Sequence, residues 1–137
     1  MAIYARQLNI PALSSATSAN GTARVGSTLA TQLVSPESIS ALCSCSIDTS
    51  SVVATFKWQV SNNGTSWYDV SGSSVSSAAG TGSTTVASDR VLVAPPQVIT
   101  WMYCRIVATL SGAATAPADV TSASYDYIGP GGLAGQY

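Results

Sequence analysis

The sequence predicts an all-β protein: a single β-sandwich of seven or eight strands with extended arms at its N- and C-terminal ends. The first observation is length, because 137 residues suffice for one domain with a substantial core. The second is a series of short runs in which apolar and polar residues alternate between turn signals. No helix of ordinary length is visible. An immunoglobulin-like and a jelly-roll topology both fit this number of strands.

The predicted boundaries divide the chain into an extended N-terminal arm at 1–26, a β-sandwich domain at 27–128 and a Gly-rich C-terminal arm at 129–137. Proline, glycine and a Ser/Ala/Thr run disfavour regular structure in the first arm, which would suit a disordered leader. Its apolar residues favour an arm that orders against a neighbouring subunit instead. The arm residues that we expect to bind a partner are Ile3, Tyr4, Leu8, Ile10, Leu133 and Tyr137.

The chain is poor in charge. Charged residues make up 8% of it, whereas soluble domains usually contain about 25%. A surface that is polar but nearly uncharged favours packing against other protein, as in a subunit of an assembly. The net charge is −1 and the five basic residues are scattered, so nucleic-acid binding lacks its electrostatic basis.

The sequence also lacks the marks of a membrane or secreted protein. No apolar run approaches the roughly 18 residues of a membrane span. The first residues have neither the charged nor the apolar region of a signal peptide. We therefore expect the product to stay in the compartment that makes it, and the odd number of cysteines, three, agrees with that expectation.

Two strands are predicted early in the domain. Residues 28–34 alternate in polarity and form the first. Residues 39–47 form the clearest strand, with apolar residues on one face and small polar residues and Leu42 on the other. Cys43 and Cys45 lie on the apolar face. Since the chain has no histidine and one further cysteine, we expect buried thiols that act as small apolar groups and no metal site.

Residues 56–70 are expected to form a central hairpin, because two of the three tryptophans flank its turn signal at 62–64. A two-residue turn would pair Trp58 with Asp69. A three-residue loop pairs Trp58 with Tyr68, which places aromatic against aromatic and also brings opposite charges together. We choose the second register. Its core face carries Phe56, Trp58, Val60, Tyr68 and Val70. Its polar face carries Lys57, Gln59, Trp67 and Asp69. Trp67 is the residue of this face that we expect to bind a partner, and the alternative is that it covers a second sheet or a loop.

The rest of the domain contains further strands. Residues 71–83 are rich in Gly, Ser and Ala and predict a long flexible loop, or one that orders against a partner. Residues 84–94 predict one or two short strands. Residues 99–110 predict a central strand with Met102 on its apolar face, and residues 120–128 predict the last strand.

No catalytic or cofactor site is predicted. Nucleophilic catalysis by serine or cysteine normally requires a base, most often histidine, which the chain lacks. The six acidic residues are spread along the chain, so neither a carboxylate pair nor a calcium loop is apparent. We expect a protein that is not an enzyme and that holds no cofactor or metal.

Cys45, Trp58 and Cys104 resemble, in their spacing, the Cys…Trp…Cys pattern of immunoglobulin domains. Met102 stands where those domains have a tyrosine, two residues before the second cysteine. The resemblance covers roughly residues 28–128 and implies an immunoglobulin-like layout, with the cysteines reduced in a chain that is not secreted.

The hairpin at 56–70 is similar to hairpins that recur in β-sandwich proteins of tailed-bacteriophage virions. Small head-decoration, or cement, proteins of such phages are often β-sandwiches or jelly rolls that bind the outside of the capsid shell. The resemblance implies a non-enzymatic virion protein that stabilises the head shell. Its partners would be the major capsid protein and neighbouring copies of itself, in a trimer for example, without nucleic acid or membrane.

Two alternatives stay open at this point. One is a phage tail or head–tail adaptor component. The other is a carbohydrate-binding module in which Trp67, Trp101 and Tyr103 form a stacking platform for sugar rings.

Overall fold

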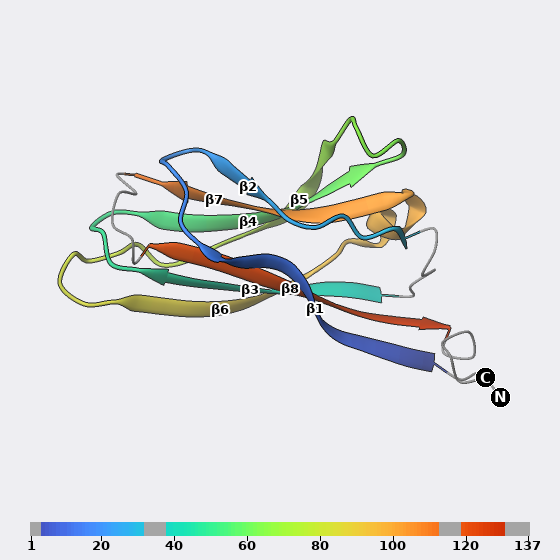
Figure 1. Cartoon of the computed structure of the whole chain (residues 1–137), viewed down its shortest axis with the longest axis horizontal. Coiled ribbons are helices and arrows are strands. Elements are labelled where there is room, and N and C mark those ends of the chain that lie inside the picture. The colour runs from blue at the N-terminus through green and yellow to red at the C-terminus, as the bar shows by residue number, and fades with distance from the viewer. Residues whose placement is uncertain (1–3, 32–37, 113–118, 131–137) are drawn as a thin grey trace.

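A two-layered sandwich is formed by the part of the chain that this computed structural model describes, which is residues 4–31, 38–112 and 119–130. At positions 4–9 and 129–130 only the backbone is described. Figure 1 shows the two sheets lying one above the other. The strands and the 3₁₀ helix η1 are β1 (Tyr4–Ala16), β2 (Ala23–Val25), β3 (Ser38–Ile47), β4 (Val53–Ser61), β5 (Tyr68–Ser76), β6 (Val86–Val93), η1 (Pro96–Thr100), β7 (Tyr103–Ser111) and β8 (Val120–Pro130).

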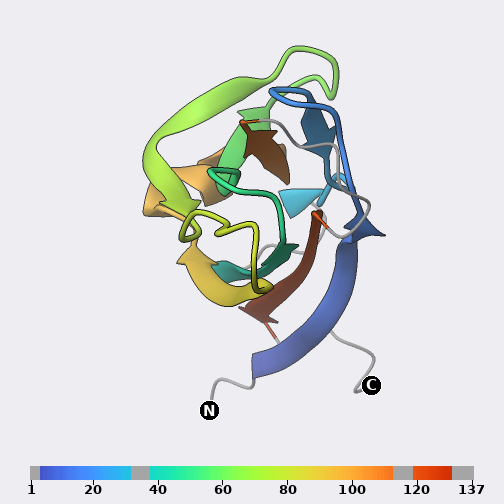
Figure 2. The same ribbon diagram turned by 90° about the vertical axis from the view of Figure 1, so that its left-hand side faces the viewer.

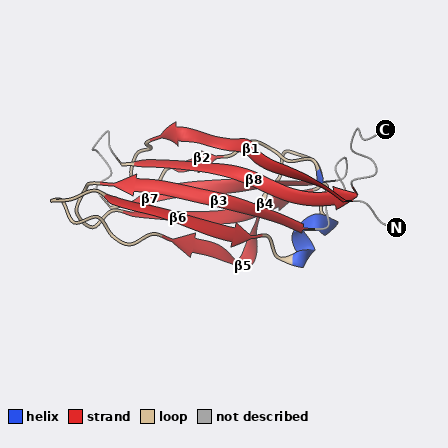
Figure 3. Ribbon diagram, turned by 90° about the horizontal axis from the view of Figure 1, so that it is seen from below, coloured by secondary structure: helices blue, strands red, loops and turns tan. Residues whose placement is uncertain are grey.

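The strand order is that of a jelly roll. One four-stranded sheet has the order β1-β8-β3-β6 and the other the order β2-β7-β4-β5, with antiparallel pairing in both. Pairing is therefore nested: β1 with β8, β2 with β7, β3 with β6, and β4 with β5 (Figure 3). In an immunoglobulin sandwich the first two strands are neighbours in one sheet, whereas β1 and β2 here belong to different sheets. The predicted all-β sandwich is confirmed, and its topology is the jelly roll.

Each sheet ends in strands that have a neighbour on one side only. Figure 2 shows β5 and β6 on one flank of the sandwich and β1 and β2 on the other. β5 and β6 are in contact with each other, although they belong to different sheets. No helix in the described residues is both long and apolar enough to cross a membrane.

The core lies between the two sheets, and β3 supplies its most regular part. The predicted alternation is confirmed, because the five residues of the apolar face are all buried: Ile39, Ala41, Cys43, Cys45 and Ile47. Cys104 of β7 is also buried, and the three cysteines are free thiols. Burial, with a smaller effect of Cys45, raises the pKa of the Cys43 thiol to about 12, and burial raises the pKa of Cys104 to the same value. These thiols are therefore uncharged and behave as small apolar side chains.

Tyr125 of β8 connects the two sheets. Its hydroxyl accepts a hydrogen bond from the Ile106 N–H of β7 at 2.9 Å and donates one to the Ser27 carbonyl at 2.8 Å. Its ring stacks on that of Trp58, with 5.7 Å between centroids and 21° between planes. Both rings are fully buried, and the Trp58 Nε1–H donates to the Leu92 carbonyl of β6 at 3.2 Å. The Tyr125 hydroxyl and the Trp58 ring nitrogen thus both have backbone partners, as buried polar atoms of aromatic side chains usually do.

The predicted N-terminal arm at 1–26 is wrong for most of its length. Tyr4–Ala16 forms β1, which pairs with β8 from Tyr4↔Pro130 to Ala16↔Thr121, and Ala23–Val25 forms β2. An edge strand is held by backbone hydrogen bonds along one side, so it does not require strict alternation and it tolerates Pro11. The register shifts between Gln7 and Ala16 agree with this irregular sequence.

Three further boundaries differ from the expectations. Only Leu29 of the predicted strand at 28–34 pairs, through an isolated bridge to Cys104, and positions 32–34 lie outside the described residues. In the predicted C-terminal arm, the backbone of 129–130 belongs to β8, and residues 131–137 lie outside the described part. Met102 precedes β7 and is 41% exposed, so its predicted place on the apolar face is wrong.

We predict that Tyr125→Phe lowers the free energy of unfolding by about 1–3 kcal/mol, because the Ile106 N–H loses its buried acceptor while the ring stack is kept. Urea unfolding measures the effect. Tyr127→Phe on the same strand is the matched control, since no hydrogen bond of the Tyr127 hydroxyl is seen in the described residues. Equal stability of the two variants would show that the Tyr125 hydroxyl does not join the sheets.

Candidate interaction surfaces

The β4–β5 loop is shaped by its own side chains. Ser61 Oγ accepts hydrogen bonds from the Asn63 and Gly64 N–H groups, and Asn63 Oδ1 accepts from those of Thr65 and Ser66. Gly64 has a φ of +72°, a conformation that glycine adopts without strain. The side-chain caps therefore stabilise a longer loop than a simple three-residue turn.

This longer loop changes the register of the hairpin. Val60 pairs with Tyr68, so the predicted pairing of Trp58 with Tyr68 is wrong. A bulge follows in β5, where the buried Ser73 Oγ accepts from the Trp58 N–H and donates to the Val70 carbonyl. Beyond the bulge, β5 continues to Ser76, which corrects the flexible loop expected at 71–83. Phe56, Trp58, Val60 and Val70 are buried as predicted, whereas Tyr68 is 56% exposed.

Trp67 lies over the outer face of the β2-β7-β4-β5 sheet. The Arg105 guanidinium of β7 sits 4.0 Å from the centre of its ring, in a cation–π contact. Arg105 Nε–H donates to Gln59 Oε1 at 2.9 Å, and Gln59 Nε2–H donates to Asp69 Oδ1 at 2.8 Å. Lys57 completes this chain of contacts through its ion pair with Asp69 at 2.7 Å.

These contacts fix Trp67 and leave it half-buried. The side-chain hydrogen bonds from Lys57 and then Gln59 lower the pKa of the Asp69 carboxyl, so it remains ionised near neutral pH. Burial lowers the pKa of Arg105, which still stays charged. The opposite charges that the hairpin sequence suggested do meet, although Gln59 and not Lys57 is the backbone partner of Asp69. A ring held in this way has little conformational freedom to lose on binding.

An aromatic patch lies at the same end of the sandwich, and we define it as Tyr68, Trp101 and Met102. The rings of Tyr68 and Trp101 are 5.8 Å apart between centroids, tilted by 44°. Tyr68 and Met102 are 56% and 41% exposed, and Trp101 is half-buried. The Met102 N–H donates to Asn62 Oδ1 at 3.0 Å, which ties the segment after η1 to the β4–β5 loop. Figure 1 shows this loop and η1 at one end of the molecule.

Sequence reasoning missed Tyr68 and Met102, because both were assigned to the core from strand periodicity alone. The signal that could have placed Tyr68 is Ser61 beside Asn63, a pair able to cap a longer loop. Of the three residues considered as a sugar platform, Trp101 packs on Tyr68, whereas Trp67 packs on Arg105. The platform of Trp67, Trp101 and Tyr103 stays a prediction.

The other partner-binding residues expected from the sequence fall into two groups. Ile10 is half-buried against the core, while Tyr4 and Leu8 lie within β1 at positions where the structure describes only the backbone. Three more lie outside the described residues: Ile3, Leu133 and Tyr137. Their binding to a partner remains a prediction.

A second apolar surface lies on the opposite sheet. Val91 and Val93 of edge strand β6 are 66% and 64% exposed, and Leu42, which pairs with Val91, is 36% exposed. This aliphatic strip has no aromatic member.

Asp119 forms a polar site at the other end of the sandwich, just before β8. It is fully buried, and its Oδ1 accepts hydrogen bonds from the Asp48 N–H at 2.7 Å and the Thr49 N–H at 2.9 Å. Burial raises the pKa of this carboxyl, but the Thr49 side chain and the two N–H groups lower it by more, so the net pKa lies below its ordinary value. No group of three or more His, Cys, Asp or Glu side chains able to hold a metal is found among the described residues.

No protein-family model matches the chain, and no curated protein matches it. Among solved structures, it is similar to one of the Gx strain of infectious bursal disease virus, with 16% identity and a TM-score of 0.49, covering 98% of this chain and 33% of that chain. The Gt strain gives 14% identity and a TM-score of 0.47, covering 96% of this chain and 34% of that chain. A mutant VP2 protein of the same virus, in derived T=1 particles, gives 15% identity and a TM-score of 0.47, covering 96% of this chain and 33% of that chain.

The chain thus spans about a third of the length of those chains. At this identity, a likeness concerns the fold and not the function.

We predict that Asp119→Asn flattens the acid limb of the stability curve. A carboxyl with a lowered pKa in the folded state stabilises the fold above its unfolded pKa of about 3.9, and that stability is lost as the pH falls through the folded pKa. Urea unfolding from about pH 5 to about pH 2 should show a smaller loss for the variant than for the native chain. Parallel curves would mean that Asp119 does not contribute in this way.

Proposed function

We propose that this chain is a non-enzymatic structural protein of a virion and, more specifically, a decoration (cement) protein that binds and stabilises the head shell of a tailed bacteriophage. The observation that carries the proposal is the nested strand order of the two sheets. Jelly rolls of this kind are typical of viral capsid proteins, lectins and cupins. The chain has no histidine, which is a frequent catalytic base, so base catalysis by histidine is not available to it.

The composition supports a place within an assembly. With 8% charged residues, the surface carries little of the repulsion that keeps free subunits apart. The ion pair seen in the described residues, Lys57–Asp69, is joined through Gln59 and Arg105 to Trp67 and so stiffens one face of the sheet. A rigid face of this kind can dock without a large loss of conformational entropy.

The aromatic patch is the surface that we assign to the capsid partner. Tyrosine, tryptophan and methionine are enriched in the cores of protein interfaces. Tyr68 and Met102 are already exposed and are anchored by backbone contacts, so they can insert into a groove between capsid subunits. Attachment would require about 1,000 Å² or more of buried surface, and many copies on one shell would add avidity.

The chain termini supply the second part of the proposed attachment. Because Tyr4 pairs with Pro130, the chain enters and leaves the sandwich side by side. Residues beyond this pair would reach a neighbouring capsid subunit or a second copy of this chain from one point. Of the residues expected in this role, Ile3, Leu133 and Tyr137 lie beyond the pair, whereas Tyr4, Leu8 and Ile10 lie within β1 and would bind a partner along that edge strand.

We predict that the purified chain co-sediments with expanded phage heads that lack their decoration protein, and that Tyr68→Ala weakens this binding at least tenfold. The reason is the loss of an exposed aromatic anchor, for which about 2 kcal/mol is usual at an interface hot spot. Thermal unfolding should change little, since Tyr68 lies outside the core. Val91→Thr on the opposite sheet is the control and should bind like the native chain.

The same assay separates the alternatives. Binding to phage tails or connectors but not to heads would favour a tail or adaptor component. The exposed Tyr68–Trp101 pair is the specific observation that favours a carbohydrate-binding module. Binding to a polysaccharide that is lost in Tyr68→Ala, with no binding to any particle, would replace the decoration proposal by that module.

A further inference from the structure

Three buried oxygen atoms near the end of β3 have no hydrogen-bond partner among the described residues. They are Asp48 Oδ1, Thr49 Oγ1 and Asp119 Oδ2. Buried polar atoms in native proteins nearly always have a partner, and leaving one without a partner is costly. Two of these atoms belong to the turn after β3, and the third belongs to Asp119, which binds that turn. Together they indicate that a ligand or ordered water belongs there.

The carboxylate of Asp119 holds this group together. Its Oδ1 binds the N–H groups of both Asp48 and Thr49, so the residues that carry the other two oxygens are fixed to it. Asp119 is 0% exposed, which makes Oδ2 a fully buried anionic oxygen. The Thr49 side chain also lowers the pKa of this carboxyl, so the Thr49 hydroxyl lies close to it.

The charge of the site is not balanced by protein cations. The backbone N–H of Asp48 is bound to the Asp119 carboxylate, and no Lys or Arg side chain of the described residues forms an ion pair with either acidic residue. Negative charges in partly buried positions repel each other, and a bound cation would remove that cost.

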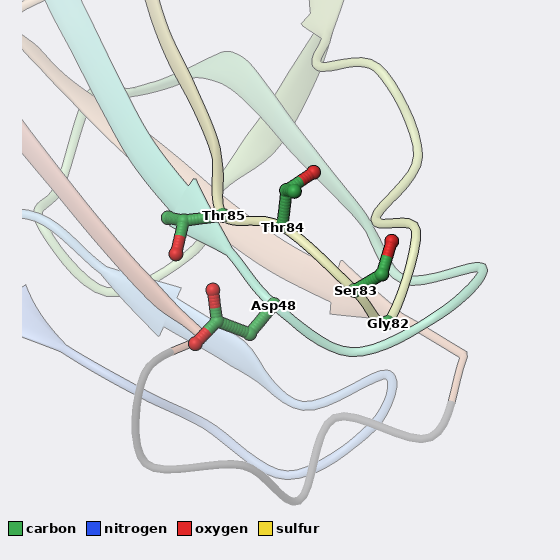
Figure 4. Close-up of a pocket in the computed structure, with 5 residues that line it drawn as sticks. All are labelled: Asp48, Gly82, Ser83, Thr84 and Thr85. Atoms are coloured by element: carbon green, nitrogen blue, oxygen red, sulfur yellow. The ribbon is translucent and has the colours of Figure 1, made fainter.

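A polar hollow beside Asp48 opens that part of the site to solvent; Thr49 and Asp119 do not line it. It has a volume of about 170 Å³ and is lined by Asp48, Gly82, Ser83, Thr84 and Thr85. Figure 4 shows the Asp48 carboxylate pointing toward the Thr85 side chain. The Gly82 N–H donates to the Asp48 carbonyl at 3.0 Å, which fixes this wall of the hollow against the turn. An ion can therefore reach the Asp48 carboxylate and keep water molecules on its open side.

We propose that Asp48, Thr49 and Asp119 hold one hard divalent cation, calcium or magnesium, between β3 and β8. Carboxylate and hydroxyl oxygens are hard ligands, and the two negative charges match a divalent ion. Waters in the hollow complete the coordination. The sequence did not reveal this site, because Asp48 and Asp119 are 71 positions apart and neither belongs to an acidic loop.

The test uses the purified full chain after treatment with a chelator. Isothermal titration with CaCl₂ and with MgCl₂, each against NaCl of equal ionic strength, should give saturable binding of one cation per chain, with a Kd below about 1 mM for at least one of the two. The melting temperature should rise with the same cation. No saturable heat and no rise in melting temperature for either cation up to about 10 mM would overturn the proposal.

Two variants make the test specific. Asp48→Asn keeps every backbone contact of the turn and should weaken binding at least tenfold, whereas Asp89→Asn, at an exposed position of β6, should bind like the native chain. If Asp48→Asn retains native affinity, or if both variants weaken binding equally, the assignment is overturned. The result is independent of attachment to a phage head, because it needs no partner.

Discussion

The contact between Tyr125 and Trp58 is the interaction on which the rest of the structure depends. Tyr125 belongs to β8, which lies between β1 and β3 in one sheet, and Trp58 belongs to β4, at the centre of the other. The stacked rings lie between the two layers. The Tyr125 hydroxyl binds the backbone of Ile106 in β7 and of Ser27, just after β2. Gly26 accommodates this arrangement, since a Cβ there would lie 2.8 Å from the Ile106 carbonyl oxygen and 3.1 Å from the Tyr125 hydroxyl. These core contacts thus hold the two sheets together and fix β2, the short strand at the edge of one sheet.

Regular periodicity made part of this fold predictable. The alternation at 39–47 identified β3 and its buried face, and the pattern at 99–110 placed Cys104 in the core of β7. Both strands lie inside a sheet, where side-chain burial on one face dictates the sequence. The spacing of Cys45, Trp58 and Cys104 correctly marked core positions, but three buried positions do not determine strand order, and the topology proved to be a jelly roll.

The features that the sequence did not predict depend on contacts of another kind. β1 is held at a sheet edge by backbone hydrogen bonds, which leave little imprint on side-chain pattern. The hairpin register depends on the caps made by Ser61 and Asn63, and it exposes Tyr68, the main residue of the aromatic patch. Asp119 reaches a turn that is distant in the sequence. The candidate surfaces arise from these loops, and this is why strand periodicity alone misplaced them.

We assign stability to the core and propose that attachment belongs to the loop end that carries the aromatic patch. Hydrogen–deuterium exchange of the chain, with and without expanded phage heads, tests that division most directly. The account predicts that heads slow exchange in peptides covering 61–68 and 99–103 and leave those of β6 unchanged. Exchange that heads do not alter, or slowing confined to β6, would contradict it.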